Sequence, residues 1–391
     1  MSATRRQGLW VFLMLTTLSG YSAEVFIRAN QLGYRPPALK IAIAFSTTPL
    51  PREFVLTGTN SVQPLFKGKL KPINRVRWGQ FDHHGELNFS AWNRPGTYKL
   101  RVGDGECWPF VIDEHANDEL PDQLLEFMRE QRCGYNPWLD AVCHSSDGRT
   151  AYGPLSAGSF IDARGGWHDA ADLLKYLLTS GNATAQMLLA FELRPKAQVP
   201  SPESKVESSK TAREDPEFKK EGFPAQGLFA DEVDSAGKPG GNGVPDVLDE
   251  ARWGLEWMLK LHPAPDQLYH QVADDRDHIG RRLPQNDTAD YGWGKGGARV
   301  VYCADGQPQG LQQYQSASTG IANLAGRYAA AMGLAYQVLS DDPRQRDFAR
   351  RCLRAGEEVY ALGRAKEGVQ QGNSYRAPYR YEETTWADDM E

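Results

Sequence analysis

The spacing of apolar and polar residues changes once along the chain, near Asp118. Before that point, residues 24–113 hold short runs rich in β-branched and aromatic side chains. Proline, glycine and asparagine separate these runs at intervals of about 8–12 residues, which is the rhythm of an all-β domain. The segment 24–113 therefore predicts a small immunoglobulin-like β-sandwich.

After Asp118, apolar residues recur at helical spacing. The runs with this pattern are residues 122–132, 171–193, 246–261, 319–339 and 344–363. Because no strand-rich run alternates with them, they disfavour a doubly wound α/β domain and predict an all-α domain over residues 114–391. The connections at 133–165 and 262–312 are long enough to suggest a functional role. Residues 194–221 are rich in Pro, Ser, Lys and Glu, which predicts a solvated, disordered insertion.

The N-terminus has the pattern of a secretory signal peptide. Two arginines precede an apolar run from Leu9 to about Leu18, and small residues follow up to Ala23. We expect residues 1–23 to be removed during export, which predicts a secreted or periplasmic protein with no membrane attachment afterwards. An uncleaved anchor is the alternative, although the apolar run is short for a membrane span. The formal net charge of −6 argues against nucleic acid as a partner.

The stretch GGWHDAADLLKY holds the first candidate for chemistry. Asp169 and Asp172 stand three positions apart at the start of a helical pattern, where carboxylates commonly stabilise a helix N-terminus. The alternative is a pair of carboxylates that activates a water at the mouth of a pocket. Gly165 and Gly166 would let the backbone turn tightly before the pair. Trp167 would offer a face on which a sugar can stack.

The chain has five cysteines, an odd number that cannot pair completely within an exported chain. Cys133, Cys143, His144 and His168 supply two thiolates and two imidazoles, which is a common tetrahedral zinc complement. Their spacing is not that of a zinc finger. A disulfide between the two cysteines, with incidental histidines, is the alternative. A zinc ion here would fix His168 and so position its neighbour Asp169.

A third cluster follows the predicted insertion. Glu232, Asp234, Asn242 and Asp246 alternate with glycines before a helix, and oxygen ligands on a turning loop suit calcium. The spacing does not match an EF-hand. Capping of the following helix by Asp246, after Pro245, is the alternative. Further along, residues 270–284 crowd acidic side chains that indicate either a solvated face or a polar sugar-binding cleft.

These motifs resemble glycoside hydrolase family 9, the inverting cellulases and related β-glucanases. GGWHDAADLLKY is similar to the family motif GGW-[YH]-DAGD-x-x-KY, with Ala171 where glycine is usual. GNGVPDVLDEARWGLEWMLKL is similar to the family's GNGIPDILDEARW helix, and RANQLGYRP resembles the opening of an immunoglobulin-like module found in many members. QRCGYNP and VCH match the zinc-binding members, and PYRYEETTWADDME resembles a segment of the catalytic domain. The resemblance runs from about Arg28 to Glu391.

The resemblance implies an (α/α)6 barrel with an open substrate cleft. It implies that Asp172 is the general base and that Asp169 helps to hold the attacking water. It also implies that the two cysteines and two histidines bind zinc, and that calcium binds near the third cluster in some members. Inverting hydrolysis further needs a carboxylic acid on the other side of the scissile bond.

In the family, that acid is a Glu near the C-terminal end of the catalytic domain, and no matching motif precedes Glu391. We therefore expect a C-terminally truncated member with only the N-terminal half of the barrel and little or no hydrolase activity. The indicated function is secreted, inverting hydrolysis of β-1,4-glucosidic bonds in cellulose or related β-glucans. A non-catalytic glucan-binding protein and a lyase built on a helical toroid are the alternatives.

Overall fold

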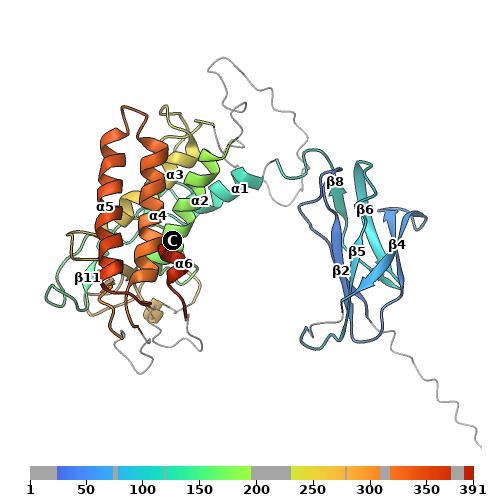
Figure 1. Ribbon diagram of the computed structural model, residues 1–391, viewed down its shortest axis with the longest axis horizontal. Coiled ribbons are helices and arrows are strands. Elements are labelled where there is room, and N and C mark those ends of the chain that lie inside the picture. Colours follow the sequence, from blue (N-terminus) through green and yellow to red (C-terminus); the bar gives the residue numbers. More distant parts are fainter. Residues whose placement is uncertain are drawn as a thin grey trace, which may run out of the picture. The chain divides into compact units, whose positions relative to one another are not determined.

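The computed structural model describes residues 24–73, 78–118, 120–194, 230–277, 280–308, 318–370 and 383–391. The predicted signal peptide lies outside these residues, as does the predicted insertion at 194–221 apart from Arg194. The described residues divide into two compact units, one ending at Asp118 and one holding the rest of the chain (Figure 1). None of the described helices is both long enough and apolar enough to cross a membrane.

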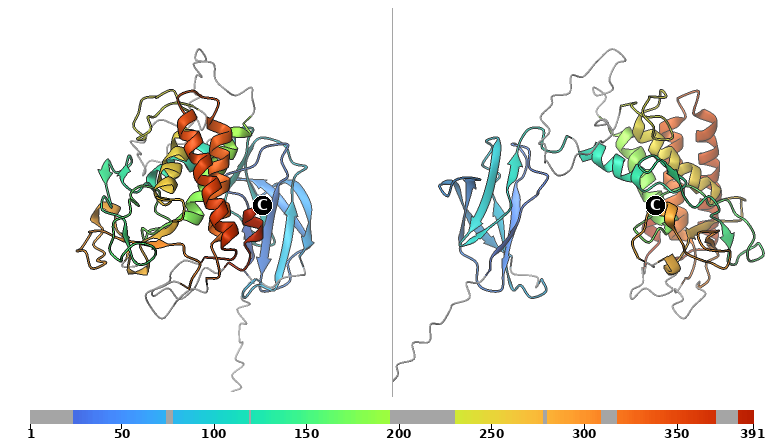
Figure 2. Two further views of the ribbon diagram at one scale, coloured as in Figure 1. Left: turned by 60° about the vertical axis from the view of Figure 1, so that its left-hand side comes forward. Right: turned by 180° about the vertical axis from the view of Figure 1, so that it is seen from behind.

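The first unit is built from strands, as the sequence pattern predicts (Figure 2). They are β1 (Phe26–Arg28), β2 (Ile41–Ser46), β3 (Glu53–Gly58), β4 (Pro64–Pro72), β5 (His83–Asn88), β6 (Gly96–Val102), β7 (Gly105–Glu106) and β8 (Phe110–Ile112). The hydrogen-bonded order is β1-β2-β5-β4-β3-β6-β7, and β8 pairs with β6. Every second side chain of β2 is buried, because neighbouring side chains of a strand point to opposite faces. The buried side chains of the strands form one core, which includes Phe54, Leu87 and Phe110.

The second unit is mainly helical. Its described helices are α1 (Leu120–Glu130), α2 (Leu177–Glu192), α3 (Asp246–Lys260), α4 (Ala322–Leu339), α5 (Arg346–Ala365) and α6 (Ala387–Met390), with short 3-10 helices η2 (Asp275–Asp277) and η3 (Pro284–Asn286). Helix α2 packs against α3 and α4, and α4 packs against α5 and α6 (Figure 1). The five helices that the periodicity predicts are confirmed, although α2 begins at Leu177 rather than at residue 171.

Short strands interrupt the helices. They are β9 (Tyr135–Asn136), β10 (Ala141–Val142), β11 (Arg149–Thr150), β12 (Lys175–Tyr176), β13 (Tyr269–Val272) and β14 (Val300–Cys303). β9 pairs with β10, and the others form a four-stranded sheet in the order β11-β14-β13-β12. The prediction of an all-α unit is wrong in this respect, because strands this short carry too little alternation to be distinguished from loops. The sheet ties the two long connections to the residues just before α2.

Helix α3 approaches α2 closely at Gly254. A Cβ atom at this position would lie 2.3 Å from Thr184 Oγ1 on α2 and 2.3 Å from the ring of Trp167. Only a residue without a side chain therefore lets α3 pack against both. The core of this unit continues through Leu255 and Trp257 on α3 to Tyr328 on α4.

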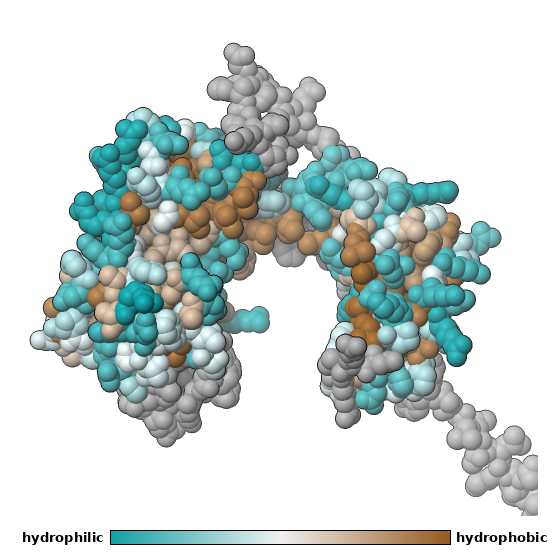
Figure 3. All heavy atoms as spheres, in the orientation of Figure 1, coloured by the Kyte–Doolittle hydropathy of each residue, from teal (hydrophilic) through white to brown (hydrophobic). Residues whose placement is uncertain are grey.

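Apolar side chains also reach the surface of the helical unit. Figure 3 shows them gathered over α1 and α2. Leu124 and Phe127 on α1 are 57% and 54% exposed, and Leu189 on α2 is 43% exposed. Groups of exposed apolar side chains often mark contact surfaces.

Candidate active site and metal site

Asp169 and Asp172 lie in a turn, residues 169–174, which we call the carboxylate turn. The N–H of Asp169 donates to the carbonyl of Leu174 over 2.8 Å, and the N–H of Leu173 donates to the carbonyl of Ala170 over 3.0 Å. Strand β12 separates this turn from α2, so the interpretation of the pair as helix caps is wrong. Asp169 is exposed and Asp172 is half-buried, so the turn brings both to the surface.

The Asp169 carboxyl group is oriented by its neighbours. Thr179 Oγ1 donates to Asp169 Oδ1 over 2.8 Å. Desolvation by the surrounding protein raises the pKa of Asp169; the Thr179 hydroxyl opposes this shift and the charge of Asp172 adds to it. Two carboxyl groups that reach the surface from one short turn suit the joint holding of one water molecule.

Indole N–H groups of α3 hold the segment that precedes the carboxylate turn. Trp257 Nε1 donates to the carbonyl of Ala163 over 3.0 Å, and Trp253 Nε1 donates to the carbonyl of Gly166 over 2.9 Å. Gly165 and Gly166 have φ of +99° and +72°, which confirms the predicted tight turn. A Cβ atom on Gly166 would lie 2.5 Å from the Trp257 ring, so this position requires glycine.

Trp167 has no face available to a substrate. Its side chain is buried, with 3% exposure, and its Nε1 donates to Glu250 Oε1 over 2.7 Å. Its ring packs against α3 at Gly254. The prediction that Trp167 stacks on a sugar is therefore wrong, because the indole fills the interface that fixes the carboxylate turn on α3.

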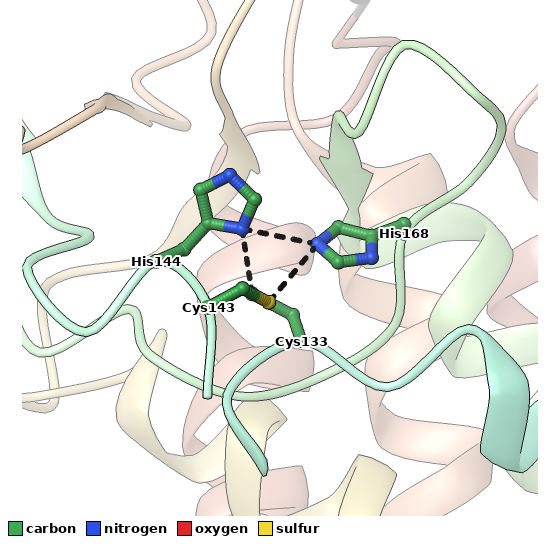
Figure 4. Close-up of side chains that lie close together, drawn as sticks. All are labelled: Cys133, Cys143, His144 and His168. Carbon is green, nitrogen blue, oxygen red and sulfur yellow. Dashed lines mark hydrogen bonds between the residues drawn. The ribbon is translucent and has the colours of Figure 1, made fainter. Parts of the chain in front are cut away.

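The predicted zinc ligands come together in the buried interior (Figure 4). Their ligand atoms all lie within 4.8 Å of one another, and in the part of the chain that the structure describes they form the only such cluster of at least three residues. His168 Nε2 lies 3.2 Å from His144 Nδ1. Cys133 Sγ lies 3.7 Å from His144 Nδ1, and Cys143 Sγ lies 3.9 Å from His168 Nε2.

These distances fit a tetrahedral zinc site. With Zn–S bonds of about 2.3 Å and Zn–N bonds of about 2.0–2.1 Å, the ligand atoms of a tetrahedron are roughly 3.3–3.8 Å apart. All five cysteines fall within the described residues and are free, so the structure does not contain the alternative disulfide between Cys133 and Cys143. Burial lowers the pKa of His168, which favours the neutral imidazole that a metal binds.

The protein also favours a thiolate in this cluster. Burial raises the pKa of the Cys133 thiol, but the hydrogen bond from Cys143 and the charge of Lys175 outweigh burial and hold that pKa well below its usual value. Lys175 Nζ lies 3.3 Å from Cys133 Sγ. A deprotonated sulfur beside a buried ammonium group is the form that binds a metal ion.

Asp287 fixes the orientation of His144. Its Oδ2 lies 3.0 Å from His144 Nε2, so the other ring nitrogen of His144, Nδ1, faces the cluster. Arg282 continues the network, because its Nε donates to Asp287 Oδ1 over 2.8 Å and its Nη2 to Asp277 Oδ1 over 2.5 Å. Asp277 is fully buried, so this part of the acidic segment 270–284 is neither a solvated face nor a cleft wall.

Asp147 and Arg299 are supporting residues that the sequence did not reveal. Asp147 is fully buried between Lys175, whose Nζ lies 2.8 Å away, and Arg299, which donates to both of its carboxylate oxygens over 2.7 Å. The three residues are far apart in the sequence: Asp147 and Arg299 stand among ordinary loop residues, and Lys175 lies in β12. Only the four-stranded sheet, which brings β11, β12 and β14 together, places them around Cys133.

The predicted calcium ligands do not converge. Asp246 is buried and its Oδ1 accepts the backbone N–H of Glu232 over 3.2 Å, and no side chain caps α3. Asp234 Oδ1 accepts two backbone N–H groups of its own loop, each over 2.9 Å. The side chain of Asn242 donates to a neighbouring carboxylate over 2.7 Å. Among the described residues, these carboxylates form no cluster that could hold a metal ion.

A cleft of about 490 Å³ lies beside this loop. Its lining includes Asn242, Asp249, Trp253 and Arg344, and therefore comes from the loop before α3, from α3 and from the segment before α5 rather than from the carboxylate turn. Burial raises the pKa of Asp249 to about 6, although the hydrogen bond from Asn242 opposes this shift. The cleft is thus separate from the candidate active site.

Comparison with known proteins identifies both units. The sequence profile of glycosyl hydrolase family 9 matches residues 118–391, which is more than half of the chain. This chain belongs to glycosyl hydrolase family 9. The profile of the cellulase N-terminal immunoglobulin-like domain matches residues 23–106, so the strands of the first unit form an immunoglobulin-like domain. The helical unit is a family 9 domain, whose fold is a helical barrel.

Several family 9 proteins are similar to this chain. A xyloglucan-specific endo-β-1,4-glucanase of Bacteroides ovatus is 27% identical over 63% of this chain and 38% of its own length. Endoglucanase C of Cellulomonas fimi is 27% identical over 92% of this chain and 31% of its own length. The crystal structure of a metagenome-derived family 9 endoglucanase is 26% identical, with a TM-score of 0.63 over 94% of this chain and 59% of that one. The chain thus spans less than two thirds of the length of each of these three proteins.

Proposed function

We propose that this family 9 chain serves the inverting hydrolysis of β-1,4-glucosidic bonds in cellulose or a related β-glucan. The carboxylate turn carries the proposal, because it presents Asp169 and Asp172 at the surface while its backbone is anchored in the core. The names of two similar proteins, a xyloglucan-specific endo-β-1,4-glucanase and an endoglucanase, support a β-glucan as the substrate class.

Asp172 is the general base in this proposal and Asp169 orients the attacking water. In inverting hydrolysis, acid and base stand about 6.5–9.5 Å apart with water between the base and the sugar. Asp169 and Asp172 occupy one short turn, so both belong to the water side of the scissile bond. The acid comes from another segment, and our expectation that it lies beyond Glu391 stays a prediction.

A zinc ion bound by Cys133, Cys143, His144 and His168 is part of the proposal. The four ligand atoms lie within 4.8 Å of one another and are buried, as in structural sites closed to water. The ion would cross-link the loop after α1 to the residue before Asp169. Calcium at Glu232, Asp234, Asn242 and Asp246 has no such support. Export to the periplasm or the medium is proposed from the N-terminal sequence pattern alone.

An aryl β-cellobioside with a leaving group that departs without protonation tests the role of Asp172 in the 391-residue chain. Such a substrate needs the base but not the acid, so we expect turnover that inverts the anomeric centre. Asp172→Asn should lower this turnover by about 10²–10⁴-fold. Asp341→Asn, an exposed carboxylate in the connection between α4 and α5, is the matched control and should have no effect.

Soluble mixed-linkage β-glucan tests the position of the acid. If the acid lies beyond Glu391, the chain should cleave the aryl substrate and leave the glucan intact. Equal turnover of both substrates would contradict that expectation. Glucan binding without turnover of either substrate, unchanged in Asp172→Asn, would contradict the hydrolase proposal and favour a glucan-binding protein.

A further inference from the structure

Arg299, which directly precedes β14, connects the metal cluster to the carboxylate turn. It is 1% exposed, and its Nε and Nη2 donate to the two oxygens of Asp147, each over 2.7 Å. Its Nη2 also lies 4.0 Å from Cys133 Sγ. On the other side of the guanidinium group, Nη1 donates to the carbonyl of Leu173 over 2.7 Å.

Leu173 is the point at which the turn needs support. Its φ is +63°, in the left-handed region that residues other than glycine rarely adopt. It directly follows Asp172, so a change in its backbone would redirect the carboxylate. The N–H of Leu173 donates to the carbonyl of Ala170 within the turn, and Arg299 adds a charge-assisted bond to the carbonyl of Leu173 from outside the turn.

We propose that Arg299 is a positioning residue that holds the Asp172 carboxylate in place by binding the Leu173 carbonyl, with Asp147 fixing the guanidinium group. The inference rests on the proposed role of Asp172 as general base. Arginine suits this task because its planar fork donates in three fixed directions at once. Lysine could keep the charge but could not serve both Asp147 oxygens and the Leu173 carbonyl.

Arg327 on α4 provides a matched control. It is a half-buried arginine of the same unit, and its Nε donates to the carboxylate of Asp389 on α6. This hydrogen bond joins α4 to α6 and involves neither the carboxylate turn nor the four predicted metal ligands. A variant at Arg327 therefore reports the effect of replacing an arginine that holds a carboxylate elsewhere in the unit.

The experiment compares Arg299→Lys and Arg327→Lys in the zinc-loaded chain by amide hydrogen exchange, bound zinc and turnover of the aryl β-cellobioside. Arg299→Lys should speed exchange in peptides covering residues 169–174 by about tenfold or more, because a charged hydrogen bond is lost. It should retain bound zinc and lower kcat by a similar factor with little change in KM. Arg327→Lys should leave exchange at residues 169–174 and kcat unchanged.

Unaltered exchange at residues 169–174 in Arg299→Lys would overturn the inference, and so would an equal effect of Arg327→Lys. Because exchange does not depend on turnover, an inactive wild-type chain would count against the proposed function and leave the exchange comparison decisive for Arg299. If Arg299→Lys is insoluble, Asp147→Asn loosens the same guanidinium group while keeping the shape of the cluster. Exchange should then rise at residues 169–174, and wild-type exchange in that variant would overturn the inference.

Discussion

Asp169 and Asp172 each have a neighbour in the chain that buried groups hold in place. His168 precedes Asp169, faces the Cys2His2 cluster and donates its N–H to the carbonyl of Gln131 over 2.8 Å. Leu173 follows Asp172, and its carbonyl accepts a hydrogen bond from Arg299. The protein therefore controls both carboxylates through the backbone.

Replacing Trp167 by phenylalanine distinguishes its observed position from the predicted sugar-stacking role. The change removes the hydrogen bond to Glu250, a carboxylate that is fully buried, while keeping an aromatic ring. Leaving such a group with fewer partners should lower the free energy of unfolding by about 1–3 kcal/mol. Urea denaturation measures this loss. KM for the aryl β-cellobioside should not change, since the ring is buried.

Trp293→Phe is the control, because Trp293 is 40% exposed and its replacement should alter the free energy of unfolding by less than about 0.5 kcal/mol. A raised KM for Trp167→Phe at full stability would restore the stacking role and contradict the position seen here.

At the scale of elements, sequence periodicity predicted the helices well and the carboxylate turn poorly. Helices α3, α4 and α5 have long amphipathic patterns, and each is found close to its predicted range. The helical pattern of α2 extends back through residues 171–176, but Gly166 and the left-handed Leu173 create a turn there and β12 pairs with β13. Long-range pairing of this kind overrides a local pattern.

The candidate site was likewise predicted only in part from the sequence. The donor chemistry of Cys133, Cys143, His144 and His168 was visible in the sequence because metal ligands are restricted to a few residue types. Asp147 and Arg299 were not visible, because a buried ion pair has no spacing rule. Trp167 was misinterpreted for a related reason, since an indole beside two glycines gives no sign of which surface will cover it.

The close contact between α3 and α2 predicts that replacing Gly254 by alanine destabilises the protein. In Gly254→Ala the new methyl group would lie 2.3 Å from both Thr184 Oγ1 and the Trp167 ring, so the helices must separate. Overpacking of this kind should lower the free energy of unfolding by about 1–3 kcal/mol. Because Trp167 precedes the carboxylate turn, hydrogen exchange at residues 169–174 should also increase.

Gly333→Ala on α4 is the matched control. No atom lies within 4 Å of the Cβ position there, and alanine is favoured over glycine within a helix by about 1 kcal/mol. Chemical denaturation should therefore place Gly333→Ala at or above the wild-type stability. Equal losses in both variants would show that the α2–α3 contact is looser than the structure indicates.

For the whole molecule, the metal site belongs to one of the two units. The four ligand residues lie between Cys133 and His168, inside the helical unit, and the described residues of the immunoglobulin-like unit contain no comparable cluster. Zinc binding should thus stabilise the helical unit alone. The two units have separate hydrophobic cores. Calorimetry should therefore show zinc binding as a shift in the unfolding transition of the helical unit only.

Chelation of zinc should lower the Tm of the helical unit and leave the other transition in place. At free zinc about 1,000 times above Kd, binding adds about 4 kcal/mol to stability. For a domain of this size, that corresponds to a Tm difference of roughly 8–16 °C. Cys143→Ser should have the lower Tm from the start and no further response to the chelator. Cys303→Ser removes a buried thiol outside the cluster and should keep the full response, whereas equal chelator responses of all three proteins would exclude the cluster as the zinc site.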